Sequence, residues 1–370
     1  MVCGLGCVGA ATAHHAAAQG LRVLGLEQFP ALHDRGSSHG HSRIFRIAYF
    51  EAPAYVPLAR RALDGWRALE DRLGRRLLAT TGGLDIGRPD GRLLPGAIRS
   101  CAVHDIRHER WSASMLADLA PGLRLPGDVE AVYQPDAGIL NPTEATGALH
   151  EAAGLSGARL RFETRVRGWE VEGGGVRVHA EDATGGFEVR AERLVVAPGA
   201  WLGALAEAQG LSGVPAILPE RQVIGWIPEP APGADHAFPV INADLEEGHV
   251  YFMPAHAGRG VKAGLYHHRG EVIDAPDRRD AAPDEADRAL LQGLVDRYIR
   301  PPGPIGEMRT CRFTLTPDEH FVLDTALGGR VVIGGGCSGH GFKFGPALGA
   351  MLAELPDPDC PRDGVVLRVL

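Results

Sequence analysis

The spacing of apolar residues along the chain predicts three helices. Residues 54–75 place charged side chains between apolar ones that recur near helical spacing, namely Leu58, Leu63, Trp66, Leu69 and Leu73. This pattern is typical of a long amphipathic helix. A second helix is expected to begin after Asn141, because Asn141 suits the N-cap, Pro142 the first helical position and Glu144 the third. A charged helix is expected near residues 283–299.

Short apolar and alternating runs predict two regions of strands. Residues 158–197 are typical of a meander of short strands with a GGG turn, followed by the buried run "LVVAPG". Residues 213–317 predict a second region of strands. Residues 329–355 predict a buried strand, a glycine-rich loop and a final helix. We therefore expect a mixed α/β protein in which one domain is built from segments that are separated along the chain.

The N-terminus carries a glycine pattern with a physical meaning. Gly4, Gly6 and Gly9 stand where a tight turn, a close approach to a pyrophosphate and close helix packing would require glycine. The Ala-rich run that follows predicts a helix ending at Gly20, whose N-terminal amides suit phosphate groups. The next strand ends at Glu27, 18 residues after Gly9, near the expected position of a carboxylate that binds ribose hydroxyls. The pattern predicts a dinucleotide site.

Only Met1, Val2 and Cys3 precede this glycine turn. We therefore expect either a short first strand or a start codon that lies upstream. The apolar N-terminal stretch lacks a basic region and contains histidines, so it is not expected to be a signal peptide.

Composition excludes several classes of partner. The 370 residues are 45% hydrophobic and 23% charged, as in globular proteins large enough for two domains. The formal net charge is -8 and no basic run stands out, so nucleic acid is not an expected partner. No stretch approaches a membrane span, so no membrane partner is expected. Six scattered cysteines without a CxxC pair predict no disulfide framework and a cytoplasmic location.

The basic residues are distributed unevenly between the two types. The chain has 38 lysines and arginines, and only Lys262 and Lys343 are lysine. A GC-rich coding sequence would produce such a bias by itself. Lysine is also required wherever a compact charge with a tunable pKa is needed, which arginine cannot supply. Both interpretations are open on composition alone.

Four motifs in order resemble those of monomeric sarcosine oxidase and its relatives, which include N-methyltryptophan, pipecolate and fructosyl amino acid oxidases. The motifs are "GSSHGHSRIFRIAY" (36–49), "YQPDAGIL" (133–140), "TCRFTLTPDEHFVLD" (310–324) and "GGGCSGHGFKFG" (334–345). The similarity runs through nearly the whole chain. It implies an oxidase with covalent FAD that converts a secondary amine beside a carboxylate to an imine and reduces oxygen to hydrogen peroxide.

The resemblance also implies a domain division. A discontinuous Rossmann-like FAD-binding domain would comprise residues 1–78, 142–212 and 318–370. A substrate domain with a mixed or antiparallel sheet would comprise residues 79–141 and 213–317. The family resemblance further implies a monomer with a small amino acid substrate and oxygen as partners.

The resemblance assigns roles to individual residues. Cys311 matches the cysteine that holds the flavin through a thioether, although a free cysteine is usually a small buried hydrophobe. Lys343 and Arg46 match the pair that binds the substrate carboxylate, for which a point charge and a planar fork are chemically suited. Lys262 matches the lysine over the flavin that promotes reaction with oxygen. The two lysines of the chain therefore fall on the two positions where the family uses lysine chemically.

The remaining assignments concern the cofactor and the substrate pocket. His39 and Arg43 match basic residues beside the flavin, and Tyr251 matches an active-site aromatic residue. The cofactor is also expected to contact Val166, Gly339, Gly341 and Lys343.

One active-site histidine is harder to place. His267 is the expected counterpart in the run "KAGLYHH", which is one residue longer than that of the family, so His268 or Tyr266 are alternatives.

One position departs from the pattern of the sarcosine-oxidising members. Two residues after Cys311 they carry tyrosine, and this chain has Phe313. Loss of that hydroxyl disfavours sarcosine and favours a bulkier or more apolar amine. Three other functions remain open: a dehydrogenase of the same fold with another electron acceptor, a flavin-binding protein without turnover, and an NAD dehydrogenase, which would leave the C-terminal glycine loop unexplained.

Overall fold

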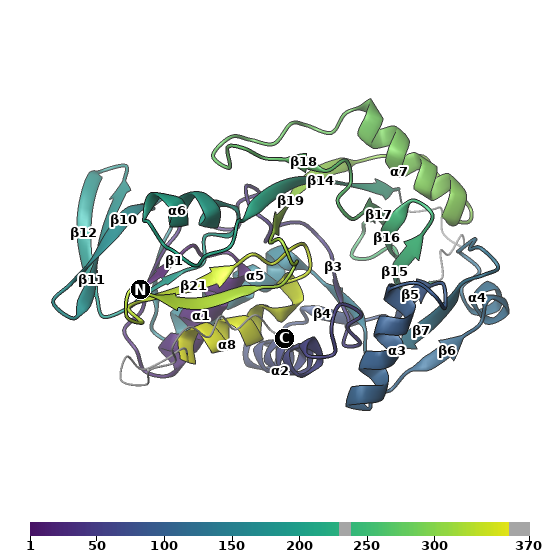
Figure 1. Ribbon diagram of the computed structural model, residues 1–370, viewed down its shortest axis with the longest axis horizontal. Helices are drawn as coiled ribbons and strands as arrows, with labels where there is room; N and C mark the ends of the chain where they lie inside the picture. The colour runs from purple at the N-terminus through teal and green to yellow at the C-terminus, as the bar shows by residue number, and fades with distance from the viewer. Residues whose placement is uncertain (229–237, 355–370) are drawn as a thin grey trace.

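The computed structural model describes residues 1–228 and 238–354 and contains two large sheets (Figure 1). The six-stranded sheet has the order β20-β21-β13-β1-β2-β9, and all neighbours are parallel except β20 and β21. Its strands are β1 (Val2–Cys3), β2 (Leu24–Leu26), β9 (Arg159–Arg161), β13 (Leu194–Val196), β20 (Val322–Ala326) and β21 (Val331–Gly335). A mixed α/β fold was expected from the sequence and is confirmed.

Four helices pack around this sheet, as Figure 1 shows. They are α1 (Cys7–Ala18), α2 (Tyr55–Leu73), α5 (Pro142–Leu155) and α8 (Gly345–Glu354). Helix α1 lies between α5 and α8, and its alanine surface allows close packing: a Cβ at Gly349 of α8 would lie 2.4 Å from the Cβ of Ala11. The helix expected over residues 54–75 is observed as α2. The N-cap expected at Asn141 is also observed, because its Oδ1 accepts the backbone N–H of Glu144 at 3.2 Å.

A small antiparallel meander lies at one end of the molecule (Figure 1). It consists of β10 (Arg165–Glu172), β11 (Gly175–Asp182) and β12 (Gly185–Ala191), which form an antiparallel three-stranded sheet at the left of Figure 1. Gly173 and Gly174 make the first turn with φ values of 51° and 83°. The short helices η1 (Gly199–Trp201) and α6 (Leu202–Ala208) follow β13. The strand pattern expected over residues 158–197 is therefore confirmed.

The second large sheet has nine strands and is mostly antiparallel. Its members are β5 (Gly83–Gly87), β6 (Glu109–Trp111), β7 (Glu130–Gln134), β14 (Leu218–Ile227), β15 (Val240–Leu245), β16 (Gly248–Met253), β17 (Val261–Leu265), β18 (Glu271–Val272) and β19 (Met308–Leu315). Helices α3 (Leu93–His104), α4 (Ala113–Leu119) and α7 (Glu285–Tyr298) pack near it (Figure 1).

A fourth sheet also has three strands. It has the order β3-β8-β4 and consists of β3 (Arg43–Phe45), β4 (Leu78–Thr80) and β8 (Gly138–Leu140). Because β3 lies within the motif at 36–49 and β8 lies within the motif at 133–140, this sheet brings two distant segments of the chain together.

The strands of the two large sheets come from different segments of the chain. The six-stranded sheet uses residues 2–26, 159–196 and 322–335, whereas the nine-stranded sheet uses residues 83–134 and 218–315. The domain boundaries expected from the sequence stay a prediction, and residues 355–370 of the last segment lie outside the described residues. Among the described residues, no helix is both long and apolar enough to cross a membrane.

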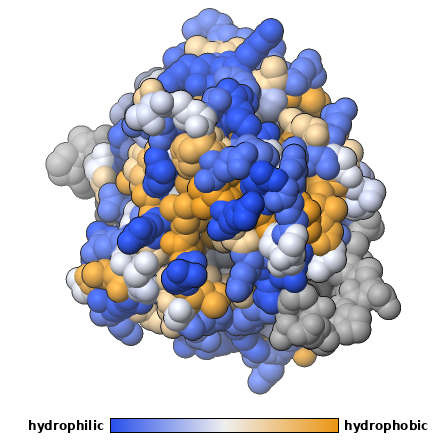
Figure 2. Space-filling view, turned by 90° about the vertical axis from the view of Figure 1, so that its left-hand side faces the viewer, coloured by the Kyte–Doolittle hydropathy of each residue, from blue (hydrophilic) through white to orange (hydrophobic). Residues whose placement is uncertain are grey.

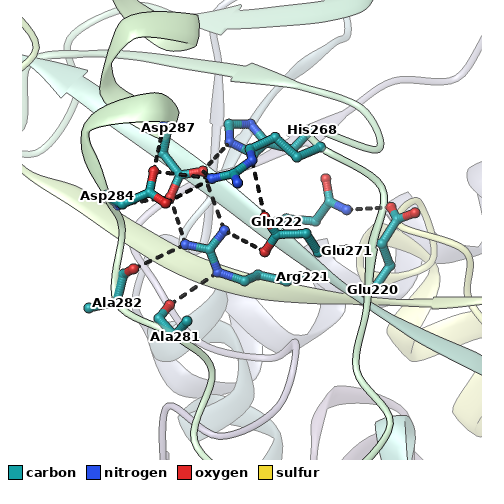
Figure 3. Close-up of polar contacts among 10 residues, drawn as sticks. Glu220, Arg221, Gln222, His268, Glu271, Ala281, Ala282, Asp284 and Asp287 are labelled. Carbon is teal, nitrogen blue, oxygen red and sulfur yellow. Dashed lines mark hydrogen bonds and ion pairs between the residues drawn. The ribbon is translucent and has the colours of Figure 1, made fainter.

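A buried ion-pair network fixes α7 to the nine-stranded sheet. Arg221 of β14 points away from its neighbours Glu220 and Gln222, toward the segment that enters α7 (Figure 3). Its Nη2 lies 2.7 Å from Asp287, and it also donates to the backbone oxygens of Ala281 and Ala282.

Asp287 is itself buried and acts as an anchor for several groups. It completes a capping box with Asp284 at the start of α7 and accepts a hydrogen bond from His268 at 2.9 Å. Despite the burial, the bonds from Arg221 and the Asp284 backbone lower the pKa of Asp287. The carboxylate is therefore ionised at neutral pH, and its hydrogen-bond partners offset the cost of burying the charge.

We expect Arg221→Ala to destabilise the protein by about 3 kcal/mol, because it leaves a buried carboxylate without its main cation. Urea unfolding measures the loss. The matched control is Arg297→Ala in α7, whose half-exposed ion pairs with Glu246 and Glu247 predict a loss below about 1 kcal/mol. Equal losses in the two variants would contradict the assigned role of Arg221.

Candidate active site

One cavity lies where the glycine turn meets the six-stranded sheet. Its volume is about 410 Å³, in the range of cofactor sites. Its lining includes apolar residues of α6 and β10, elements on the side of the molecule that Figure 2 presents. On that face hydrophobic residues gather around a hollow, with polar residues around them.

The three glycines have the geometry expected of a dinucleotide turn. Gly4 has a φ of +88°, and a Cβ there would lie 2.5 Å from the backbone oxygen of Ala197. A Cβ at Gly9 would lie 1.9 Å from the oxygen of Gly4, so only glycine allows α1 to approach the turn this closely. Gly6 is the N-cap of α1 and lines the cavity. The start of α1 therefore faces a space suited to phosphate groups.

The carboxylate expected to bind ribose also lines the larger cavity. Glu27 follows β2 and accepts the backbone N–H groups of Leu5 at 2.9 Å and Phe29 at 3.1 Å. These bonds hold the side chain beside the glycine turn. Val166 lines the same cavity from β10. The residues present thus fit a dinucleotide, and ribose binding by Glu27 stays a prediction.

A smaller cavity of about 70 Å³ adjoins the C-terminal glycine loop. Its lining includes four of the cationic residues expected from the sequence, namely Arg43, Arg46, Lys262 and Lys343. Cys311, Tyr251 and Gly339 line it as well, and Phe342 lines both cavities. The structure therefore brings together most of the substrate-site residues that the sequence suggested, and the two cavities share a wall.

One face of the nine-stranded sheet forms a wall of the smaller cavity. Alternate residues of a strand point to the same face, and the strand registers align them in rows. One row runs through Asp85, Asn242, Tyr251, Gly264 and Ile224. In the neighbouring rows Met253 pairs with Lys262 and Gln222 pairs with Cys311. The position of each residue in its strand therefore decides whether it reaches the cavity.

Lys343 is held at the cavity by neutral oxygen atoms. It lies in η2 (Phe342–Phe344), and its Nζ donates to the backbone oxygen of His340 at 2.8 Å and to the hydroxyl of Tyr49 at 3.2 Å. Burial, with the nearby charge of Arg46, lowers the pKa of Lys343 to about 7. The side-chain amine of Lys343 is therefore poised to gain a proton when an anion enters the cavity.

Arg46 carries its own counter-charge. Its Nη2 lies 2.6 Å from the carboxylate of Glu51, and its Nη1 donates to the backbone oxygen of Ala48 at 3.1 Å. Burial opposes the charge, but the pairing with Glu51 outweighs it and raises the pKa of Arg46. A guanidinium has five N–H donors, and these two bonds leave others for a ligand.

Lys262 and Arg43 lie near Cys311. The Nζ of Lys262 donates to the backbone oxygen of Ser42 at 2.9 Å, and burial together with the charge of Arg43 lowers the pKa of Lys262 far below its usual value. Arg43 places its Nη2 3.4 Å from the Sγ of Cys311 and also donates to the backbone oxygen of His39. Cys311 itself is buried on β19.

Aromatic rings form the apolar part of the smaller cavity. The Tyr251 and Tyr266 rings meet edge to face at 6.0 Å, and Tyr266 lies 5.2 Å from the ring of Phe313. A Cβ at Gly264 would lie 2.3 Å from the ring of Tyr251, so glycine makes room for that ring. Phe313 thus stands in the wall, as its position after Cys311 implied.

His267 is not brought to either cavity. It belongs to the turn after β17 and bonds to the carboxylates of Glu220 at 3.1 Å and Glu319 at 3.2 Å. Tyr266 lines the cavity instead, because it lies four residues after Lys262 and therefore on the same face of the sheet. His268, the other alternative, bonds to Asp287.

His39 and Gly341 also lie outside the residues that line the two cavities. His39 is buried, and burial with the adjacent Arg43 lowers its pKa to about 4, so its imidazole is neutral. A Cβ at Gly341 would lie 2.5 Å from the Cβ of Cys337, so this glycine serves the packing of the loop. Cofactor contacts of these two residues stay predictions.

Two cavity neighbours were missed at the level of sequence. Asn242 lines the smaller cavity, and Asp85 bonds to it from the adjacent strand β5. Each is a polar residue inside an otherwise apolar strand, in "VINADL" and "GGLDIG". That signal is visible in the sequence, but the pairing of the two strands is not.

Comparison with known proteins identifies the class. A family model described as FAD dependent oxidoreductase (DAO) matches residues 1–355, and the chain belongs to this family. A monomeric sarcosine oxidase of Streptomyces avermitilis is 38% identical over 363 residues, which cover 96% of this chain and 92% of that protein. An N-methyl-L-tryptophan oxidase of Yersinia pestis is 30% identical over 359 residues, with coverages of 95% and 93%.

A solved structure agrees with these relatives. The open form of NikD, an unusual amino acid oxidase essential for nikkomycin biosynthesis, is similar with a TM-score of 0.81 and 27% identity, covering 98% of this chain and 95% of that one. The resemblance stated from the sequence motifs is confirmed. The protein is an FAD-dependent oxidoreductase similar to sarcosine and N-methyltryptophan oxidases.

The low pKa of Lys343 predicts a pH dependence of anion binding. We expect acetate, which lacks an amine, to bind the flavin-loaded protein with nearly constant affinity around pH 6, where acetate stays ionised, and up to about tenfold more weakly per pH unit above pH 7. The sign follows because only the protonated lysine attracts the anion, and the free lysine loses its proton near pH 7. Flavin absorbance measures the affinity. The same slope in Lys343→Met would show that another group titrates.

Proposed function

We propose that this protein oxidises a secondary amino acid, with an N-methyl or cyclic amine, to the imine and reduces oxygen to hydrogen peroxide. The observation that carries the proposal is the small cavity that Arg46 and Lys343 line together with Lys262 and Cys311. The names of the similar proteins, which act on sarcosine and N-methyl-L-tryptophan, support the same substrate class.

Arg46 and Lys343 are proposed to bind the substrate carboxylate. Both side chains are buried, so their attraction for an anion is less screened than at the surface. The planar fork and the point charge come from different segments, because Arg46 directly follows β3 and Lys343 lies in η2. Together they fix the orientation of the amino acid, and the neighbouring aromatic wall contacts its apolar part.

The cofactor of the family supplies the oxidation when it is bound. Bound FAD would supply a two-electron acceptor, with oxygen as the proposed final acceptor. We propose that the glycine turn and Glu27 hold its dinucleotide part and that Cys311 attaches its ring through a thioether. The contact of Cys311 with Arg43 and its place in the lining of the smaller cavity support this attachment site.

The overall reaction balances without a further reactant. The amino acid loses two protons, one from carbon and one from nitrogen, together with two electrons, and the C–N single bond becomes a C=N bond. Molecular oxygen gains the two protons and the two electrons and leaves as hydrogen peroxide. The imine then adds water and divides into an amine and a carbonyl compound, or persists if it is cyclic.

The aromatic wall bears on which amine is used. Phe313 contributes a ring without a hydroxyl, and Met253, Ile44 and Ile224 add further apolar surface to the cavity. We propose that an apolar or bulkier amine than sarcosine is preferred. This selection follows from the absence of a hydroxyl at 313 together with the apolar side chains around it.

Anaerobic mixing with a panel tests the substrate class. We expect the flavin absorbance to bleach with at least one of N-methyltryptophan, L-pipecolate, L-proline, sarcosine and a fructosyl amino acid, with sarcosine among the slower. Stopped-flow absorbance measures the rates, and oxygen consumption with the same substrate separates an oxidase from a dehydrogenase. If none bleaches a flavin that dithionite reduces, the proposed substrate class is wrong.

Replacement of Lys262 tests the proposed oxygen site. A cation beside the place where oxygen is reduced stabilises the developing negative charge. We expect Lys262→Met to slow reoxidation by oxygen by at least about 100-fold and anaerobic flavin reduction by less than about tenfold. The matched control is Met253→Leu, since Met253 pairs with Lys262 across the sheet and carries no charge. Equal losses in both half-reactions would refute the role.

A further inference from the structure

A buried carboxylate behind the substrate cavity is not used by the proposed reaction. Asp85 lies on β5, is 1% exposed and accepts hydrogen bonds from two neutral side-chain amides. Gln134 Nε2 donates to its Oδ2 at 2.5 Å, and Asn242 Nδ2 donates to its Oδ1 at 2.7 Å. Each oxygen of the carboxylate therefore orients one amide.

The Gln134 amide connects Asp85 to the backbone beside Arg46. Because its Nε2 is bound to the carboxylate, its Oε1 must face the other way. That oxygen accepts the backbone N–H of Ile47 at 3.0 Å and of Ala48 at 2.7 Å. The backbone oxygen of Ala48 in turn accepts Nη1 of Arg46. Asp85 thus sets the direction of a chain of bonds that ends at the guanidinium.

The Asn242 amide connects Asp85 to the aromatic wall. Its Oδ1 faces Nε2 of His249, which must therefore carry the proton. The His249 ring stacks on Tyr266 at 4.3 Å with an interplanar angle of 4°. Burial lowers the pKa of His249 to about 3, so the stacked ring is neutral. This second chain ends at a residue that lines the cavity.

Stability alone does not account for a carboxylate in this place. Burial raises the pKa of Asp85 to about 6, with the charge of Arg46 acting against that rise, so the group is ionised at neutral pH. Its hydrogen-bond donors are amides and not cations, and a buried charge held this way costs folding free energy. A neutral side chain would avoid the cost but would not orient both amides.

We propose that Asp85 is a positioning residue for both walls of the substrate cavity, acting through the amides of Gln134 and Asn242. The carboxylate accepts from both, so each amide turns its oxygen toward the next group in its chain. The series of contacts through Gln134 holds the carboxylate-binding Arg46, and the series through Asn242 holds Tyr266. The inference rests on the proposed role of Arg46 in substrate binding.

An exchange of charge and amide tests the first chain. In Asp85→Asn, the new side chain has one oxygen and one NH2 group. The NH2 group would face an amide of Gln134 or Asn242 that also donates, so that amide must turn its oxygen toward position 85. The double change Asp85→Asn with Gln134→Glu restores the pattern, because the new carboxylate at position 134 accepts from position 85 and from both backbone N–H groups. Asp90→Asn, at an exposed aspartate after β5, is the matched control.

Two measurements on flavin-loaded protein decide the outcome. We expect Asp85→Asn to weaken acetate binding, followed by flavin absorbance, by at least about tenfold, and the double variant to return within about threefold of the unchanged protein. We expect hydrogen exchange at the amides of Ile47 and Ala48 to become faster in the single variant and to slow again in the double one. Asp90→Asn should change neither.

Other outcomes overturn the proposal or separate it from the proposed function. A lower melting temperature of Asp85→Asn with unchanged acetate affinity and exchange would leave a merely structural role and refute positioning. Failure of the double variant to restore either measurement, while folded, would do the same. If no amine is oxidised but the acetate and exchange results hold, the proposed function fails and the role of Asp85 stands. If acetate does not bind at all, exchange at Ile47 and Ala48 still decides.

Discussion

The confinement of positive charge in a small buried space is the constraint on which the substrate site depends. Arg43, Arg46, Lys262 and Lys343 line one cavity of about 70 Å³. Charges of one sign at such distances repel, and burial removes the water that would screen them. The response of the two lysines shows this cost, because burial lowers the pKa of both. An anion that enters the cavity relieves the repulsion, so the fold is prepared for a carboxylate before one arrives.

The strand registers of the nine-stranded sheet fix which side chains face the smaller cavity. Period-two alternation lets β17 present Lys262 and Gly264 to the cavity while the residue between them faces the opposite side. The same alternation sends Arg221 of β14 to the back of the sheet, where it fixes α7 (Figure 3). One strand thus serves the cavity with one face and the stability of the sheet with the other. A register shift of a single residue would exchange the two roles.

Features controlled by local sequence could be predicted, and features controlled by strand pairing could not. The glycine turn at Gly4–Gly9 and the N-cap at Asn141 follow from neighbours within a few residues, and the structure contains both. His267 does not line either cavity, and residue types alone could not show this, because the side chains that share the face of Lys262 are set by the alternation along β17; its catalytic role stays a prediction. Asp85 and Asn242 lie 157 residues apart, so their bond is visible only once β5 and β15 pair.

The two carboxylates near Arg46, Glu51 and Asp85, act on it in different ways. Glu51 forms a direct ion pair with the guanidinium and so keeps it charged in the absence of a ligand. Asp85 forms no bond to Arg46; it orients the amide that holds the adjoining backbone. Neither carboxylate is among the residues that line the smaller cavity, so the negative charges stand behind its wall and the positive ones face inward. A carboxylate in the proposed substrate site would therefore meet donors directly and counter-charges only behind the wall, which is the electrostatic condition for strong binding of an anion in a protein of net charge -8.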